Sequence, residues 1–287
     1  MRINTNISAI QAQRNMQQIS REVESSAKNL ASGARINSAS DDAAGLSISE
    51  KMKATIRSAN QAKRNANDGV SIIQTLEGSF NEVSSIFIRL KELAVQSATD
   101  TLQDENRQLI DYEFGQLKTE AKRIFSTLRV AGSSLDLGTA AQREGQILNG
   151  ITKPIDIHIG LDNDRSTNRI TLDASDLKVG EGDFKVMSRN VSTKEGARGA
   201  IMDLSEDLNT LANARAHLGA LQNRLVSAAD NLAVRSQNES ASQSVIKDAD
   251  YAYESARNLK SKILFDASTS VLSQANGVGK HTLKLIG

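Results

Sequence analysis

Few side chains in this sequence stand in a pattern that could bind a metal ion or catalyse a reaction. Asp41 and Asp42 are adjacent carboxylates, but no histidine or further acid accompanies them, so we expect helix capping rather than acid–base catalysis. Residues 162–164, Asp-Asn-Asp, open like a calcium-binding loop. However, Thr167 stands where that loop requires glycine, and Asp173 stands where it requires a bidentate glutamate. The sequence therefore predicts a polar hairpin turn at this position.

Other signals of catalysis or cofactor binding are equally weak. The segment 180–185, GEGDFK, lacks the third glycine of a dinucleotide-binding loop and does not lead from a strand into a helix. The three histidines, His158, His217 and His281, are scattered along the chain. The absence of cysteine excludes disulfides, cysteine nucleophiles and cysteine-bound metals. We therefore predict that the protein is not an enzyme and has no catalytic residue, cofactor or metal site.

The composition favours long helices in thin bundles. The 287 residues include one proline and no tryptophan, and aromatic residues make up 3% of the chain. Because proline is the strongest helix breaker, its near absence permits helices of unusual length. The net charge of +1 gives no electrostatic argument for binding nucleic acid or an anionic membrane. The first residues lack the apolar region of a secretory signal, and no apolar run is long enough to predict membrane insertion.

The N-terminal half shows helical periodicity, with apolar residues recurring at steps of three and four. A first stripe covers residues 3–30, and the polar loop that follows ends near Ser40 or Asp41, either of which could cap the next helix. From residue 52 to residue 93 the pattern persists for about six heptads, and a helix of about fifty residues around it would be roughly 75 Å long. The same spacing resumes from residue 110 to residue 128 after a polar turn, so we expect a helical hairpin.

The period changes to two in the middle of the chain and then returns to helical spacing. Ile155, Ile157, Ile159 and Leu161 alternate with polar residues, which predicts a half-buried strand. Apolar residues at positions 170 and 172 begin a return strand, completing a hairpin. Helical stripes then cover residues 201–232 and 249–271, and we expect the polar stretch 236–244 to separate them.

This symmetric order predicts a mainly α fold, a long antiparallel helical bundle or coiled coil in which the N- and C-terminal segments pair around a small β-hairpin insert. The expected segments are an inner helix with its linker (1–40), long bundle helices (41–130), a short β-rich insert without large outer domains (131–200), a C-terminal bundle helix (201–240), and a last inner helix with its tail (241–287).

The two terminal stripes predict self-assembly. Each is amphipathic but too short to be stable as an isolated helix, and a single chain would leave both apolar faces half covered. The alternative is a monomeric bundle. The side chains that we expect to mediate assembly are Ile3, Ile7, Ile10, Ile19, Val23, Leu30, Tyr253, Leu259, Ile263, Val271 and Leu272.

Both ends of the chain resemble bacterial flagellin. The N-terminal motifs are NTNISAIQAQRNM (4–16), SGARINSASDDAAGLSISEKM (32–52), NDGVSIIQTLEGSFNEV (67–83) and RLKELAVQSA (89–98). The C-terminal motifs are DADYAYESARNLKSKIL (248–264) and VLSQAN (271–276). The resemblance covers about residues 1–130 and 200–285. The middle does not match, and the tail GVGKHTLKLIG lacks the usual Pro-Gln.

The resemblance implies a structural subunit that assembles into the helical flagellar filament used for swimming motility. Such subunits are exported unfolded by the flagellar type III apparatus, and their ends become ordered on assembly. The implied partners are other copies of the subunit, the filament cap, hook-junction proteins, an export chaperone and the export apparatus. The implied location is an extracellular filament, with sheathed and periplasmic filaments as alternatives. A hook–filament junction protein and a cytoplasmic signalling coiled coil are the rival functions.

The resemblance also implies a surface read by a vertebrate Toll-like receptor. Arg89, Leu93 and Glu113 match the receptor-contact positions of the family. The alternative is that these three side chains pack between subunits.

Overall fold

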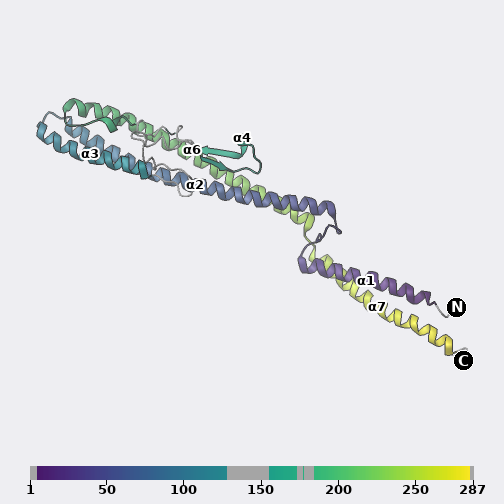
Figure 1. Cartoon of the computed structure of the whole chain (residues 1–287). Helices are drawn as coiled ribbons and strands as arrows, with labels where there is room; N and C mark the ends of the chain where they lie inside the picture. The colour runs from purple at the N-terminus through teal and green to yellow at the C-terminus, as the bar shows by residue number, and fades with distance from the viewer. Residues whose placement is uncertain (1–4, 128–154, 173–176, 178–183, 285–287) are drawn as a thin grey trace, which may run out of the picture. The chain divides into compact units, whose positions relative to one another are not determined.

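The computed structural model describes residues 5–127, 155–172, 177 and 184–284. The chain divides into two compact units, which we call the terminal unit (1–56 and 237–287) and the central unit (57–236). In chain order the elements are α1 (Ile7–Ser32), α2 (Ala43–Ser97), α3 (Asp104–Thr127), β1 (Ile155–His158), α4 (Arg165–Asn168), β2 (Arg169–Leu172), the 3-10 helix η1 (Lys185–Ser188), α6 (Lys194–Lys247) and α7 (Tyr251–Lys284) (Figure 1).

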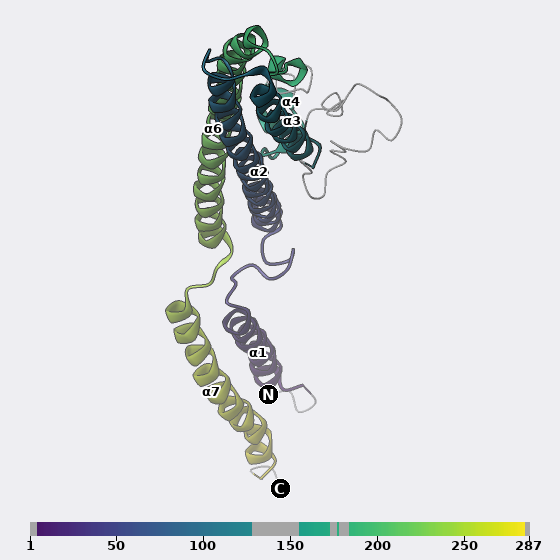
Figure 2. The ribbon, with the colours of Figure 1, turned by 90° about the vertical axis from the view of Figure 1, so that its left-hand side faces the viewer.

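The predicted fold class is confirmed: long helices dominate, and a small antiparallel hairpin accompanies them. The helix α2 contains 55 residues and no proline, and it includes the whole apolar stripe that predicted it. In the central unit α2, α3 and α6 lie alongside one another (Figure 2). Their stripes meet in one apolar core, whose largest buried side chains are Phe80, Phe87, Phe114, Ile73, Leu90, Leu93, Leu204, Leu211, Leu218 and Leu225.

Phenylalanine rings join the insert to the helical hairpin. Phe184, just before η1, contacts Phe87 of α2 edge-to-face and stacks on Phe125 of α3, with ring centroids 5.2 Å apart in both pairs. Asp207 of α6 accepts hydrogen bonds from the backbone N–H groups of Lys185 and Val186, at 3.1 and 2.9 Å. Burial raises the pKa of this carboxyl. The segment after the hairpin is therefore fixed on all three helices.

Arg107 ties the end of α2 to the start of α3. Its buried guanidinium donates to the backbone oxygens of Ser97 and Thr99, at 3.0 and 2.7 Å, and to the carboxylate of Asp104, at 2.6 Å. The carbonyls at a helix C-terminus lack partners within the helix, so one arginine satisfies them here and closes the predicted hairpin.

The β-hairpin pairs Ile155 with Leu172 and Ile157 with Ile170. The alternation predicted a first strand through Leu161, but β1 ends at His158. The buried face of the hairpin packs on α2 and α6, and Gly69 of α2 makes this approach possible. A Cβ atom added at Gly69 would lie 2.6 Å from Cδ1 of Ile157 and 3.1 Å from Cδ1 of Leu225. The predicted polar turn contains α4, in which Thr167 donates to the Asp164 carboxylate.

Three local predictions need correction. The cap of α2 is Asp42, which accepts from the N–H of Gly45 at 2.9 Å, whereas Asp41 accepts from the loop N–H groups of residues 37 and 38. The polar stretch 236–244 does not interrupt α6, because it contains neither glycine nor proline and its polar side chains are compatible with a helix. The break falls at residues 248–250 instead. Helical structure also begins at Lys194, before the apolar stripe at residue 201.

Candidate assembly surfaces

The terminal unit is built on the pairing of α1 with α7, which lie side by side in both views (Figures 1 and 2). Asn6 caps α1 by accepting from the N–H of Ala9 at 3.1 Å, and its amide donates to the backbone oxygen of Ala275 at 2.9 Å. At the other end, Gly33 has a left-handed φ of 68°, and its N–H donates to the oxygen of Asn29. The sequence break at Ser32–Gly33 is thus a glycine C-cap.

Backbone hydrogen bonds join the two segments that lead into this helix pair. The N–H of Arg35 donates to the oxygen of Lys247 at 2.7 Å, and the N–H of Ala249 donates to the oxygen of Gly33 at 2.9 Å. The guanidinium of Arg35 adds a bond to the oxygen of Ile246 at 2.7 Å. Within the terminal unit, hydrogen bonds therefore connect the N-terminal segment to the C-terminal segment, as the symmetric layout predicted.

The side chains predicted for assembly divide into two groups. Between 43% and 66% of the side chain is exposed for one group, which we call the outer apolar side chains: Ile7, Ile10, Tyr253, Leu259, Ile263 and Val271. A second group is half-buried: Ile19, Val23, Leu30 and Leu272. Ile3 lies outside the described residues. Sequence reasoning missed two further exposed apolar side chains on α7, Tyr251 and Leu264, although both are visible as large apolar residues beside the predicted stripe.

The interior of the helix pair is polar near the linkers. Ser26 and Asn29 of α1 are buried, as are Glu254 and Asn258 of α7. Periodicity did not reveal them, because a polar residue inside a stripe resembles an ordinary surface residue. The terminal unit thus combines a polar buried seam with exposed apolar side chains, whereas the central unit has a conventional apolar core.

On the central unit, Arg89 and Glu113 form an exposed ion pair. Nη2 of Arg89 lies 2.9 Å from Oε1 of Glu113, and Nη1 lies 3.0 Å from Oε2 of Glu92. Glu113 and then Glu92 raise the pKa of the arginine. Leu93 is only 1% exposed and belongs to the bundle core. Of the three predicted receptor contacts, the structure therefore offers two charged groups at the surface and places the third inside.

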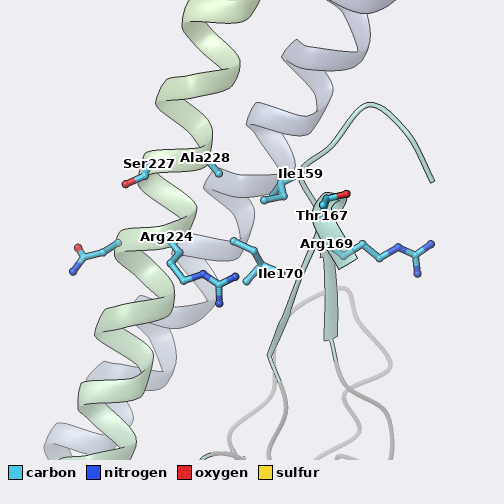
Figure 3. Close-up of a pocket in the computed structure, with 8 residues that line it drawn as sticks. Ile159, Thr167, Arg169, Ile170, Arg224, Ser227 and Ala228 are labelled. Atoms are coloured by element: carbon cyan, nitrogen blue, oxygen red, sulfur yellow. The ribbon is translucent and has the colours of Figure 1, made fainter. Parts of the chain in front are cut away.

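A groove of about 410 Å³ lies between the β-hairpin and α6 (Figure 3). Its lining residues are Ile159, Thr167, Arg169, Ile170, Asn223, Arg224, Ser227 and Ala228. Arg224 extends along the groove toward Ile170, but the guanidinium of Arg169 points away from α6 and bonds to Asp156 and Asn163. The polar groups do not converge on one point, as the polar groups of a small-molecule site do.

The described residues offer no cluster of three or more acidic or histidine side chains that could hold a metal ion. None of the described helices has both the length and the apolar character needed to cross a bilayer. Large exposed apolar side chains, in contrast, are present on both terminal helices.

Comparison with known proteins agrees with this geometry. Residues 3–139 match the model of the bacterial flagellin N-terminal helical region, and residues 201–286 match that of the bacterial flagellin C-terminal helical region. The chain is 38% identical to the flagellar filament 31.3 kDa core protein of Treponema maltophilum and 37% identical to the flagellar filament 33 kDa core protein of Treponema phagedenis. It is 36% identical to the flagellin of Halalkalibacterium halodurans. Each comparison covers 100% of both chains.

These matches cover both terminal helices, the long bundle helices and, in the full-length relatives, the insert as well. The predicted resemblance is confirmed, and with it the structural role that it implied. This chain belongs to the bacterial flagellin family and is a structural subunit of the flagellar filament.

Proposed function

We propose that the chain polymerises through the outer apolar side chains of its terminal helices, which become buried against neighbouring copies in the filament. The observation that carries this proposal is the exposure of Leu259, Ile263 and Val271 on one helix and of Ile7 and Ile10 on the other. Large apolar side chains left in water at this density mark a surface that another protein covers. In a polymer of identical subunits, the available partner is a second copy.

The contacts that follow are heterologous, so one surface of a subunit meets a different surface of the next. Contacts of this type do not close on themselves and extend into a helical polymer. Half-buried Ile19, Val23 and Leu272 contribute to the contact between α1 and α7 in this arrangement, and the outer apolar side chains contribute to the contact between subunits.

Export and ordering complete the proposed function. The chain is exported unfolded by the flagellar type III apparatus, with an export chaperone, and is added beneath a filament cap on a base of hook-junction proteins. Its terminal helices become fully ordered only when neighbouring copies cover them, which couples folding to binding. The filament lies outside the cell, as a bare or sheathed filament, or in the periplasm.

An innate receptor is a further proposed partner. The support is the exposed pair Arg89–Glu113 beside Ile88, which is 51% exposed, since charged and apolar groups together can form a contact patch. Because Leu93 is buried, its part in recognition is to support α2 from inside.

Truncation tests the assembly proposal. One variant lacks residues 1–32 and removes α1, and a second lacks residues 250–287 and removes α7; both leave the central unit intact. We expect both to keep the melting transition of the central unit and to form no filaments when seeded with fragments of the parent filament. The full chain under the same salt and seeding is the control. Filaments from either truncated chain would refute the role of the terminal helices.

A further inference from the structure

Four buried polar side chains between α1 and α7 form two hydrogen-bonded pairs, and we define the polar seam as these four residues: Ser26, Asn29, Glu254 and Asn258. The amide of Asn258 donates to Oγ of Ser26 at 2.8 Å, and the amide of Asn29 donates to Oε1 of Glu254 at 3.3 Å. All four side chains are at most 8% exposed. The linker side chain of Asn37 extends the seam by donating to Oδ1 of Asn29 at 3.0 Å.

Stability does not account for this seam. A buried hydrogen bond contributes only about 1 kcal/mol net, and well-packed apolar residues at such positions are often neutral or stabilising. Glu254 is an example, because its Oε2 is buried without a hydrogen-bond partner, whereas its Oε1 forms an ion pair with Arg257 at 3.7 Å. An apolar side chain at this position would leave no polar atom without a partner.

Buried polar pairs differ from apolar ones in their dependence on alignment. Leucine packs against leucine in several registers of a heptad, whereas a buried hydrogen bond between two helices exists in one register and leaves polar groups unsatisfied in the others. Sliding α7 by one heptad along α1 would move Asn258 from Ser26 and Glu254 from Asn29 by roughly 10 Å. The best-attested use of such buried polar groups is to specify register.

We propose that the polar seam specifies the register of α1 against α7. It thereby determines which outer apolar side chains of the two helices reach a neighbouring copy together. That consequence rests on the proposed assembly function, whereas the register itself does not. The competing explanation is the backbone bridge between the linkers at residues 33–35 and 247–249, which could set the register without the seam.

Disulfide trapping separates these two explanations, and the absence of native cysteine makes every engineered pair unique. Ser20 and Lys262 line one groove between the two helices, so we choose Ser20→Cys with Lys262→Cys as the reporter pair for the native register. Positions 255 and 269 lie one heptad before and after 262, so Ser20→Cys with Ser255→Cys, or with Thr269→Cys, reports a slipped register. Each pair is made in the parent chain and in a seam variant.

The seam variant carries Ser26→Ala, Asn29→Leu, Glu254→Leu and Asn258→Leu. Its apolar side chains preserve the drive for pairing, which circular dichroism checks. In the parent chain we expect the native disulfide to exceed either slipped one at least about tenfold, because two net hydrogen bonds are at stake. In the seam variant we expect the three yields to lie within about twofold of one another. Native crosslinking alone in the seam variant would assign the register to the linker bridge and overturn the proposal.

Crosslinking is carried out on monomers and on seeded filaments, so the register is measured even where a variant does not polymerise. A second control places Leu259→Asp, on the outer surface, in the seam-intact chain. We expect it to keep the native disulfide and to lose polymerisation. If it polymerised normally with the native disulfide, the assembly proposal would fail and the seam proposal would stand. Loss of the native disulfide in this control would count against the seam, because the four seam residues are unchanged.

Discussion

One aspartate substitution in each unit can distinguish side chains needed for folding from side chains needed for assembly. Leu225 is fully buried in the central core, whereas Ile263 of α7 is 60% exposed in the single chain. The substitutions Leu225→Asp and Ile263→Asp remove apolar side chains of the same size and add the same charge. Their effects should nevertheless appear in different measurements, because the two side chains are buried at different stages.

The expected magnitudes follow from the exposed fractions. Leu225→Asp loses a complete burial and adds an unpaired buried carboxylate, a total cost of about 5 kcal/mol. In a unit spanning residues 57–236, that cost lowers the melting temperature by roughly 10–20 °C. In the single chain Ile263 is only two fifths buried, so Ile263→Asp loses about 1 kcal/mol of burial free energy there. In the filament the same change costs about 3 kcal/mol at each contact, which raises the critical concentration roughly 100-fold.

The assay combines calorimetric melting of monomers with sedimentation of seeded filaments. Ile263→Leu is the matched control, because it preserves volume and apolar character and should polymerise at nearly the parent concentration. If Ile263→Asp polymerises at a critical concentration within about threefold of the parent's, the outer apolar side chains are not the assembly surface. If it lowers the monomer melting temperature as much as Leu225→Asp does, the terminal helices are already a cooperative part of the folded chain.

Two smaller perturbations test the central unit and the linker. Gly69→Ala and Gly78→Ala both replace a glycine inside α2, but a Cβ at Gly69 meets Ile157 at 2.6 Å and one at Gly78 meets nothing within 4 Å. Gly78→Ala should raise the free energy of unfolding by about 1 kcal/mol, and Gly69→Ala should fall about 1–3 kcal/mol below it, as urea denaturation would show; equal effects would refute the close approach of the hairpin. Hydrogen bonds from two loop N–H groups lower the pKa of Asp41 in the folded chain. Its contribution to the free energy of unfolding is therefore fully present above the ordinary aspartate pKa and is lost as the pH falls through the lowered pKa of the folded state. The NMR shifts of these amide protons should therefore change only in strongly acidic solution and should not titrate there in Asp41→Asn; a transition near pH 6 would contradict this assignment.

Periodicity predicted the helices and strands whose buried face is set by a regular repeat of apolar residues within the element. The stripe from residue 52 to residue 93 and the alternation around Ile157 each repeat at a fixed interval, so one face of the element is buried whatever its partner is. The same stripe placed Leu93 in the core, whereas the family resemblance placed it at a receptor-contact position. The structure agrees with the stripe, because a side chain three residues after Leu90 continues the buried row of α2.

The polar seam could not be predicted in this way. Asn258 meets Ser26 across 232 residues of sequence, and nothing in either local pattern indicates that their side chains are buried together. The polar stretch 236–244 remains helical for a related reason, since polar side chains are compatible with a helix and only glycine or proline strongly opposes one. A polar side chain is usually predicted to be exposed to water. That prediction fails where the side chain is buried and hydrogen-bonds to another polar side chain.

The two units distribute apolar side chains in opposite ways, and this difference has a thermodynamic consequence. The central unit buries its largest apolar groups within one chain, so the stabilisation from this core does not depend on protein concentration. The terminal unit buries a polar seam and exposes Leu259 and Ile263, so under the proposed assembly part of its stabilisation comes from other copies. Stabilisation by a bound partner grows with the logarithm of that partner's free concentration. If the assembly proposal holds, the terminal helices should be weakly stable in a dilute monomer and firmly ordered at the end of a growing filament, where neighbouring copies are always present.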